Sequence, residues 1–154
     1  EGFLARSHRI VSKDPESVIH IGSNVILDRE VKLWLSGEAR LTIGDNSYLA
    51  NGSMVLSQQE VRIGSGCSIS WHVLIMDNSS YAIGYGDEDP QVRVQPVFIG
   101  DHVWIGCRAV IIKGVSVGDG AVISNNAVVT SDVPPGTLVA GNPARVVREK
   151  VVWK

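Results

Sequence analysis

Residues 97–129 read VFIGDHVWIGCRAVIIKGVSVGDGAVISNNAVV, and an aliphatic residue returns at every sixth position of this stretch. The positions are Ile99, Ile105, Ile111, Val117, Ile123 and Val129. A second apolar or small series precedes each of them by two residues: Val97, Val103, Ala109, Val115, Ala121 and Ala127. A period of six fits neither an amphipathic helix nor the simple alternation of a strand. It predicts short strands with two inward side chains each, separated by tight corners where glycines cluster. Three such units make one triangular coil of a parallel β-helix, so the fold class is all-β.

The same repeat runs through the earlier part of the chain. The inward pairs predicted there are Ile19/Ile21, Val25/Leu27, Val31/Leu33, Leu41/Ile43, Ser47/Leu49, Ser53/Val55, Val61/Ile63, Cys67/Ile69 and Val73/Ile75. Cys67 therefore falls in an inward slot, where a free thiol packs as a small apolar group. The sequence thus predicts one domain over residues 1–154, with early coils at 19–75 and late coils at 97–133.

Three segments lack the repeat. Residues 1–17 are interpreted as an irregular lead-in that ends near Pro15. Residues 77–96 are polar and rich in glycine and proline, which predicts a loop that protrudes from the coil. Residues 134–154 are expected to cap the last coil, through a short helix or extension over 144–152 with Asn142 as its N-cap.

Composition narrows the classes of function. The chain is 44% hydrophobic and 19% charged, with a formal net charge of −2, and it contains two cysteines. This balance excludes a disordered chain and argues against nucleic acid or a membrane as partner. No apolar run is long enough for a transmembrane helix. Two cysteines, Cys67 and Cys107, make no disulfide framework, so we expect a cytoplasmic protein.

Three patches carry a family resemblance: ISWHVLIMD at 69–77, IGDHVWIG at 99–106 and VTSDVPPGTLVAGNPARVVR at 129–148. They resemble the hexapeptide-repeat acyltransferases, and among these the sugar O-acetyltransferases of the galactoside, maltose and polysaccharide-modifying type. The resemblance implies a left-handed coil, a homotrimer and a site between two subunits. It also implies acetyl-CoA as co-substrate, a sugar or related hydroxyl acceptor, and no metal.

Matched to the family position by position, six residues are implied as acetyl-CoA contacts: Cys107, Asn125, Thr130, Ser131, Arg145 and Arg148. The two arginines suit the phosphates of the nucleotide, because a guanidinium binds phosphate oxygens in pairs. A solvated surface position is the alternative for both arginines. Trp104 is implied as a residue that lines the site between subunits, or that packs at the trimer contact.

Acetyl transfer to a hydroxyl needs a base, and the resemblance implies a histidine at the start of the protruding loop. Here that place reads Asp77-Asn78-Ser79-Ser80-Tyr81, and residues 77–96 contain no histidine. Asn78 or Tyr81 occupies the position, depending on the alignment of the loop. His72, just before the loop, is the candidate substitute base, and Asp77 either orients it or caps the turn into the loop. Trp71, Asn78 and His102 are candidate site-lining residues, with a plain corner position as the alternative for His102.

Two other functions stay open at this stage. A loop without histidine also fits a trimeric β-helix that has lost catalysis. A zinc-dependent carbonic anhydrase of the γ type would need three histidine ligands, whereas His8, His20, His72 and His102 lack the close pairing of such a site. Direct transfer is expected rather than an acyl-enzyme on Cys107, because no activated nucleophile is evident.

Oligomer formation follows from the shape of the coil as well as from the resemblance. Its flat faces are expected to carry outward apolar residues, namely Trp104, Val110, Ile112, Val122 and Val128. A lone coil would leave them exposed to water, whereas rotational symmetry buries the same patch in every subunit.

Overall fold

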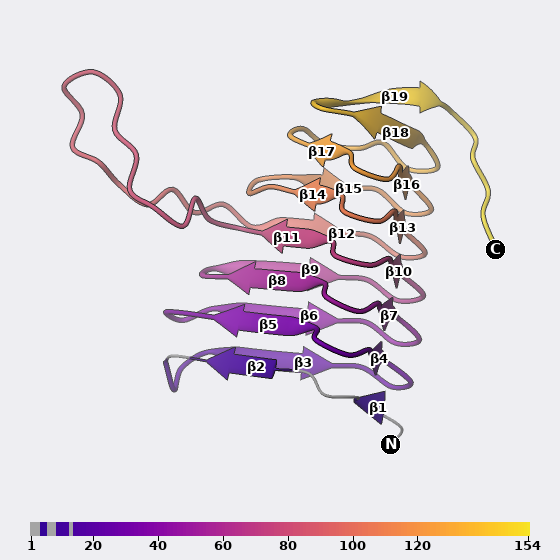
Figure 1. Cartoon of the computed structure of the whole chain (residues 1–154), viewed down its shortest axis with the longest axis horizontal. Helices are drawn as coiled ribbons and strands as arrows, with labels where there is room; N and C mark the ends of the chain where they lie inside the picture. Colours follow the sequence, from indigo (N-terminus) through magenta and orange to yellow (C-terminus); the bar gives the residue numbers. More distant parts are fainter. Residues whose placement is uncertain (1–3, 6–8, 13) are drawn as a thin grey trace.

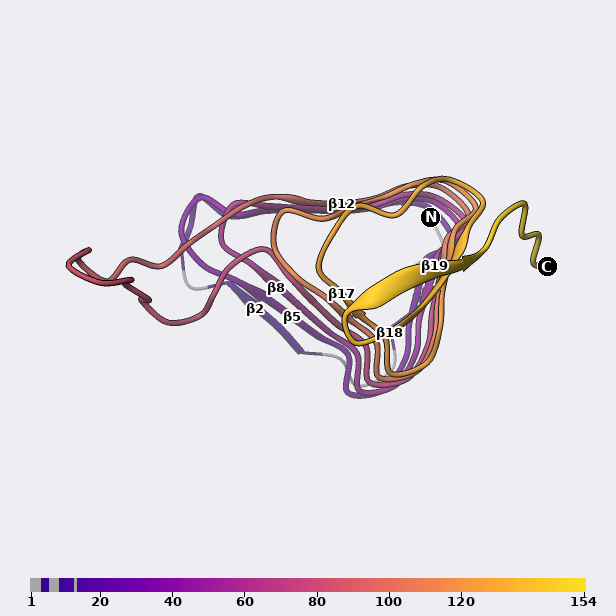
Figure 2. The same ribbon diagram turned by 90° about the horizontal axis from the view of Figure 1, so that it is seen from above.

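The computed structural model describes residues 4–5, 9–12 and 14–154. Over these residues the chain consists of strands, turns and bends and contains no helix. The strands stack into successive coils along one axis (Figure 1), and the coils enclose a triangular cross-section when viewed from above (Figure 2). The prediction of an all-β parallel β-helix is confirmed.

Each coil contributes one strand to each of three sheets, named here A, B and C. Sheet A contains β1 (Leu4–Ala5), β4 (Ile26–Leu27), β7 (Tyr48–Leu49), β10 (Ser68–Ile69), β13 (Trp104–Ile105), β16 (Val122–Ile123), β18 (Leu138–Gly141) and β19 (Ala144–Arg148). Sheet B contains β2 (Arg9–Ser12), β5 (Lys32–Leu35), β8 (Met54–Ser57), β11 (Leu74–Met76), β14 (Val110–Ile111) and β17 (Val128–Val129). Sheet C contains β3 (Val18–Ile21), β6 (Arg40–Ile43), β9 (Glu60–Ile63), β12 (Val97–Ile99) and β15 (Ser116–Val117).

The register reflects the hexapeptide period. Ile105 pairs with Ile123, one coil of 18 residues later, whereas Leu27 pairs with Leu49, 22 residues later. The early coils are longer because their strands in sheets B and C run for four residues, as in β5 and β6. The passage from sheet B to sheet C, called the B–C corner, is therefore the side where the coil expands. The protruding loop leaves the coil at the same corner (Figure 1).

The core is the column of inward side chains. Every predicted inward residue is buried except Ile19 and Ile21, which pack against the core while partly exposed. The two inward serines are paired: Ser47 donates to the carbonyl of Gly64 at 2.9 Å, and Ser53 donates to that of Ser70 at 2.8 Å. These bonds explain why a polar side chain is tolerated at a buried inward position that water does not reach.

Acidic and amide side chains hold neighbouring coils together at the corners. The carboxylate of Asp101 accepts from the backbone N–H of Ser65 at 2.7 Å, and Asp119 accepts from that of Asp101 at 2.8 Å. Asp45 does the same for Ser23. The backbone at these corners takes left-handed conformations, with φ of +57° at His72 and +53° at His102. His102 thus occupies a corner position that glycine or asparagine holds in other coils, whereas Glu30 and Arg108 share the position of His72 with glycine and asparagine.

The lead-in over residues 1–17 was predicted to be irregular, and this is wrong for its described part. Leu4–Ala5 and Arg9–Ser12 are strands that pair in parallel with β4 and β5, so a partial coil precedes the repeat. His8 lies outside the described residues. The first coil otherwise leaves a row of unpaired backbone groups, and a segment can pair with it without the hexapeptide pattern.

The helix predicted over residues 144–152 is also wrong. Ala144–Arg148 form β19, which pairs antiparallel with β18 around a turn at Asn142 and Pro143. Val146 and Val147 favour a strand, and the edge of β18 offers partners for their backbone. Residues 149–154 continue without regular structure. Ala144 joins the core, so the hairpin contributes to closing the last coil, across which β19 runs in Figure 2.

Candidate functional site

The loop over residues 77–96 extends well beyond the coils (Figure 1). Its two arms are joined by antiparallel bridges between Asn78 and Val94 and between Ile83 and Gln91. Arg93 forms an ion pair with Glu88 at 2.9 Å, and its guanidinium carbon lies 5.1 Å from the centre of the Tyr85 ring. The loop is therefore an ordered arm, with its outer part surrounded by solvent.

Asp77 fixes the base of this loop. Its side chain is fully buried and accepts bonds from the backbone N–H groups of Gln58 at 2.9 Å and Gln59 at 2.8 Å. The hydroxyl of Ser57 and the amide of Asn78 donate to it at 3.0 Å each. Among the predicted roles of Asp77, these contacts match the cap of the turn into the loop.

His72 lies at the other end of β11, at the corner between sheets A and B, called the A–B corner. Its side chain is exposed, and its ring occupies the space left by the missing side chain of Gly52 in the coil before. About five residues of extended chain, on the order of 16 Å, separate it from Asp77. Within one chain His72 and the base of the loop are thus not brought together. Trp71, 54% exposed, stands beside His72 at this corner.

Asn78 and Tyr81 differ in accessibility. Asn78 is nearly buried, and its side-chain oxygen accepts from the N–H of Ser80 at 2.9 Å. Tyr81 is 80% exposed on the loop, so its hydroxyl is open to a ligand or to another subunit. Of the two residues at the position of the implied histidine, Tyr81 is accessible and Asn78 is part of the loop's internal bonding.

The residues implied as acetyl-CoA contacts gather mainly around sheet B of the late coils. Cys107 and Asn125 lie at the A–B corner, where the Asn125 side chain accepts from the N–H of Cys107 at 2.8 Å. Thr130 and Ser131 are exposed at the B–C corner just after β17. Arg145 is the second residue of β19 and lies near the A–B corner, whereas Arg148 lies at the far end of that strand. The first five therefore flank one face, and Arg148 stands apart.

His102 and Trp104 meet the C-terminal residues. The ring of His102 stacks on Trp153 with centroids 4.2 Å apart, and its Nε2 lies 3.1 Å from the carbonyl oxygen of Trp153. Trp153 in turn donates from its indole to the carbonyl of His102 at 2.9 Å. Trp104 donates to the hydroxyl of Ser70 at 3.2 Å and stays 40% exposed. His102 thus anchors the C-terminal segment, a contact that the corner pattern did not indicate.

Four of the five residues expected to be outward and apolar are less exposed than predicted. Val122 is buried, and Ile112 packs against the core cluster. Trp104 remains exposed, and Val110 and Val128 are half-buried. The expected apolar faces are thus narrower than the repeat suggests.

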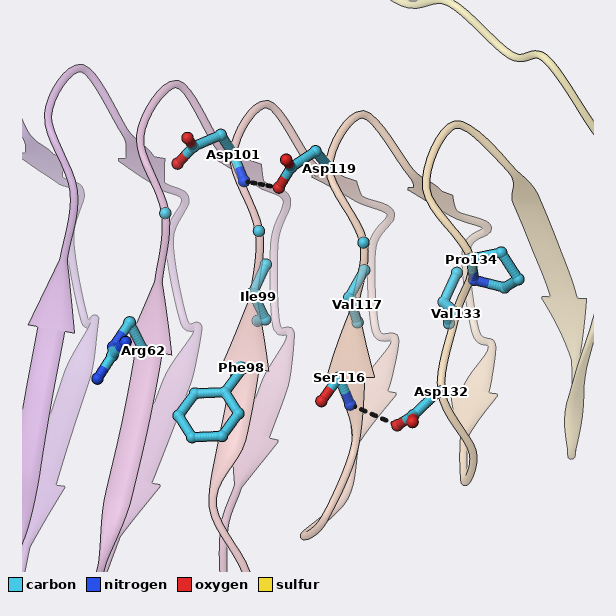
Figure 3. A pocket seen from close by; sticks show the side chains of 13 residues that line it. Arg62, Phe98, Ile99, Asp101, Ser116, Val117, Asp119, Asp132, Val133 and Pro134 are labelled. Atoms are coloured by element: carbon cyan, nitrogen blue, oxygen red, sulfur yellow. Dashed lines mark hydrogen bonds between the residues drawn. The ribbon is translucent and has the colours of Figure 1, made fainter.

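A groove of about 480 Å³ crosses sheet C. Arg62, Phe98 and Ser116 project along it, with Asp132 and Pro134 at its C-terminal end (Figure 3). The carboxylates here hold the backbone of adjacent coils, as the Asp132 bond to the N–H of Ser116 at 2.8 Å shows. None of the residues predicted from the sequence as site residues lines this groove.

A second hollow, of about 540 Å³, lies on sheet B beneath the start of the loop. Its lining includes Lys32 and Trp34 from β5, Gln58 from the B–C corner, and Asn78 and Ser80 from the loop. Sequence reasoning identified Asn78 alone among these. The outward positions of β5 were the available signal, because Lys32 and Trp34 alternate there with the inward Leu33 and Leu35.

Within the part of the chain that the structure describes, no cluster of three or more His, Cys, Asp or Glu side chains could hold a metal ion. The same residues include no helix with the length and apolar character of a membrane span.

The comparisons with known proteins agree with this architecture. Residues 96–131 match the family described as the hexapeptide repeat of succinyl-transferase. The galactoside O-acetyltransferase of Escherichia coli (strain K12) is 34% identical over 129 residues, which are 84% of this chain and 63% of that protein's length. The chain thus spans somewhat under two thirds of this relative.

Two solved structures show the same fold. A hexapeptide-repeat acetyltransferase from Vibrio cholerae, solved in complex with acetyl coenzyme A, has a TM-score of 0.63 at 26% identity and covers 96% of this chain and 70% of its own. The polySia-specific acetyltransferase NeuO has a TM-score of 0.76 at 21% identity, over 99% of this chain and 87% of its own. At that identity the second match shows the fold alone, the left-handed β-helix that the resemblance implied. Residues 96–131 of this chain thus match the hexapeptide repeat, and the relatives that the chain resembles are acetyltransferases.

Proposed function

We propose that the protein transfers an acetyl group from acetyl-CoA to a hydroxyl of a sugar or a related small acceptor. One observation carries the proposal: five of the six residues matched to the family's acetyl-CoA contacts flank a single face, sheet B of the late coils, next to the base of the loop. Cys107 and Asn125 stand on one side of this face and Thr130 and Ser131 on the other. The solved relative with acetyl coenzyme A supports the choice of donor.

In the proposed reaction the acceptor oxygen attacks the thioester carbonyl while a base takes the hydroxyl proton. The C–S bond then breaks, and the CoA sulfur leaves and takes up a proton. No acyl-enzyme is needed, because Cys107 serves through its backbone N–H as a partner of Asn125.

We propose His72 as the base, with Tyr81 as the competing candidate. Both side chains are exposed, but they lie at opposite corners of sheet B. His72 is preferred because an imidazole is the side chain that most often serves as a general base. A trimer would place the A–B corner of one subunit, which carries His72, against the loop of the next. We therefore propose that residues of two subunits together form the site.

The first test is calorimetric titration with acetyl-CoA and with CoA, followed by an assay of thiol release with a panel of sugars. Saturable binding and acceptor-dependent release are expected. Neither binding nor release with any acceptor would refute the transferase and favour the alternative, a trimeric β-helix without catalysis, which the histidine-free loop motivates.

A second test separates the base candidates. We expect His72→Ala to lower kcat at least 100-fold, in line with the usual contribution of a general base, with acetyl-CoA binding retained. His20→Ala, an exposed histidine on sheet C, is the control and should keep parental activity. A large loss in Tyr81→Phe with full activity in His72→Ala would instead assign the base to Tyr81.

We also propose a homotrimer and a cytoplasmic location. The half-exposed Trp104 and the exposed aromatic residues of the loop support the first. The two unpaired thiols, Cys67 and Cys107, suit a reducing compartment.

A further inference from the structure

The hollow beneath the loop, called here the Trp34 pocket, has a definite place relative to the acetyl-CoA residues. Lys32, Trp34, Met54 and Leu56 contribute from β5 and β8 of sheet B, and the loop contributes Asn78, Ser80 and Val92. The acetyl-CoA residues flank the same sheet in later coils. Sheet B therefore carries the pocket and the proposed donor site on one continuous face.

The lining of the pocket combines an apolar plate with polar edges. Trp34 is 38% exposed and pairs in register with Leu56, so the two outward side chains lie side by side. Ser36, Gln58, Asn78 and Ser80 add hydroxyl and amide groups around them. A sugar ring has the matching character, since it presents C–H groups on its faces and hydroxyls at its edges.

The polar edge is held in place by buried bonds. The Asp77 carboxylate receives the backbone N–H groups of Gln58 and Gln59 and the side chain of Asn78. The Asn78 oxygen then accepts from both the N–H and the hydroxyl of Ser80, at 2.9 and 3.3 Å. A pocket preorganised in this way loses little conformational entropy when a ligand binds.

The charge at the pocket is positive, whereas the net charge of the chain is negative. The protein carries a formal net charge of −2, yet among the described residues that line the pocket Lys32 supplies the one full charge. The carboxylate of Asp77 behind it is fully buried and already accepts bonds from its neighbours. An ammonium at the rim of an otherwise neutral pocket favours a ligand with a negative substituent.

We propose that the Trp34 pocket binds the acceptor, and that this acceptor is a sugar ring carrying a negatively charged group. The ring lies against Trp34, its hydroxyls meet the side chains of Gln58, Asn78 and Ser80, and its anionic group faces Lys32. The inference rests on the proposed acetyl transfer, and it adds the class of acceptor and the residues that select it.

The test compares neutral methyl hexosides with the matching methyl hexuronides in the gluco, galacto and manno series, using the chain of residues 1–154. Thiol release gives kcat and KM, and calorimetry without acetyl-CoA gives sugar binding. We expect kcat/KM at least tenfold higher for the acid in one or more pairs. Lys32→Gln should bring the acid down to the neutral level, with the neutral sugar unchanged.

Trp34→Ala should raise KM at least tenfold for both members of a pair while kcat changes little. Trp34→Phe, which keeps an aromatic plate, should recover most of the loss and shows that a folding defect is not the cause. Lys113→Gln, a cation on the other side of the loop, and Phe98→Leu on sheet C are matched controls that should behave like the parent.

The outcomes separate this inference from the proposed function. The pocket inference is refuted, and the proposed transferase activity is not, by either of two results. One is acetyl transfer that is unchanged in the Lys32 and Trp34 variants, and the other is equal kcat/KM for the neutral and acidic sugar of every pair. Binding of hexuronides that depends on Lys32 and Trp34, without any release of thiol, supports the pocket and refutes the transferase. If the protein neither binds hexuronides nor releases thiol, the pocket inference and the proposed transferase activity are both refuted.

Discussion

At the scale of single residues, burial decides the role of a polar group more than its position in a motif. Asp77 stands at the start of the loop, where the family resemblance points to catalysis, yet its carboxylate is fully buried. It accepts hydrogen bonds from the backbone N–H groups of Gln58 and Gln59 and from the side chain of Asn78. Its bonds hold both the B–C corner of the preceding coil and Asn78, the next residue of the loop. Asp77 thus determines where Asn78 and Gln58 lie in the Trp34 pocket.

Asp77→Ala should therefore cost stability as well as activity. Removing the carboxylate leaves the N–H groups of Gln58 and Gln59 without their acceptor, and each such loss costs about 1–3 kcal/mol. We expect a fall of about 3 kcal/mol in the free energy of unfolding measured with urea. Asp87→Ala, an exposed acid on the same loop, is the control and should change stability by less than about 0.5 kcal/mol.

The two cysteines should differ in reactivity. Burial raises the pKa of the Cys67 thiol, and Cys67 lies 3.2 Å from the carbonyl oxygen of Gly100. Since the thiolate is the reactive form, a thiol reagent should label the partly exposed Cys107 at least tenfold faster in the folded protein. Equal labelling rates without denaturant would contradict this burial.

The same shift gives a pH dependence. Because the folded state keeps Cys67 protonated beyond the ordinary pKa of a thiol, its contribution to stability is complete below that value and is lost as the pH rises through the raised pKa. The free energy of unfolding should fall more steeply above about pH 8.5 in the parent than in Cys67→Ala. Parallel stability curves for the two proteins would argue against the raised pKa.

At the scale of elements, the two ends of the β-helix show how an open coil is closed. The early end pairs with β1 and β2, and the late end is covered by the β18–β19 hairpin and the segment after it. That segment returns to the coil through two contacts: the N–H of Val151 donates to the carbonyl of Gly136 at 2.8 Å, and Trp153 stacks on His102. Both ends satisfy backbone groups that the repeat itself leaves without a neighbour.

Trp153→Ala should release the C-terminal segment. The variant loses the stacked pair with His102 and the indole bond to its carbonyl, so we expect about 1–2 kcal/mol less stability and faster tryptic cleavage after Lys150. Val152→Ala changes a neighbour that is 82% exposed and should leave both measurements at the parental level. Unchanged cleavage in Trp153→Ala would show that this contact does not hold the segment.

At the scale of the whole molecule, a straight coil with a lateral arm presents surfaces that one copy cannot cover. The loop exposes Tyr81, Ile83 and Tyr85 to solvent, and Trp104 is half-exposed on sheet A. A closed ring of subunits would bury the same residues in every copy and bring the loop of one against a corner of the next. In that arrangement His72 would lie near the loop of a neighbouring subunit, whereas within a single chain it lies apart from the base of its own loop.

Sedimentation velocity at micromolar concentration should accordingly give a species with three times the mass of the chain. Trp104→Glu places a charge in the expected contact and should shift the protein to smaller species, whereas His20→Glu on sheet C should not. A monomeric parent under these conditions would refute the trimer and with it the site between subunits.

The sequence alone determined the fold class and most of the core. A hexapeptide period repeated over most of the chain leaves one arrangement that buries every sixth aliphatic residue, so the inward pairs and the loop at 77–96 were predictable from residue types and spacing. The strands at the chain ends were not predictable in this way. β2 and β19 form because they pair with an open edge of a sheet, and not because their own residues follow a repeating pattern. The helix predicted over 144–152 failed for this reason.

The candidate site depended on tertiary structure. Periodicity says which side chains point inward, but it does not say which outward side chains from different coils become neighbours. Lys32 and Trp34 precede Asn78 by more than forty residues, and the stacking of coils together with the Asp77 bonds brings them into one pocket. The contact of His102 with Trp153, 51 residues later, arises in the same way. Such contacts are set by the rise and width of the coils, which are properties of the folded chain and not of any local stretch of sequence.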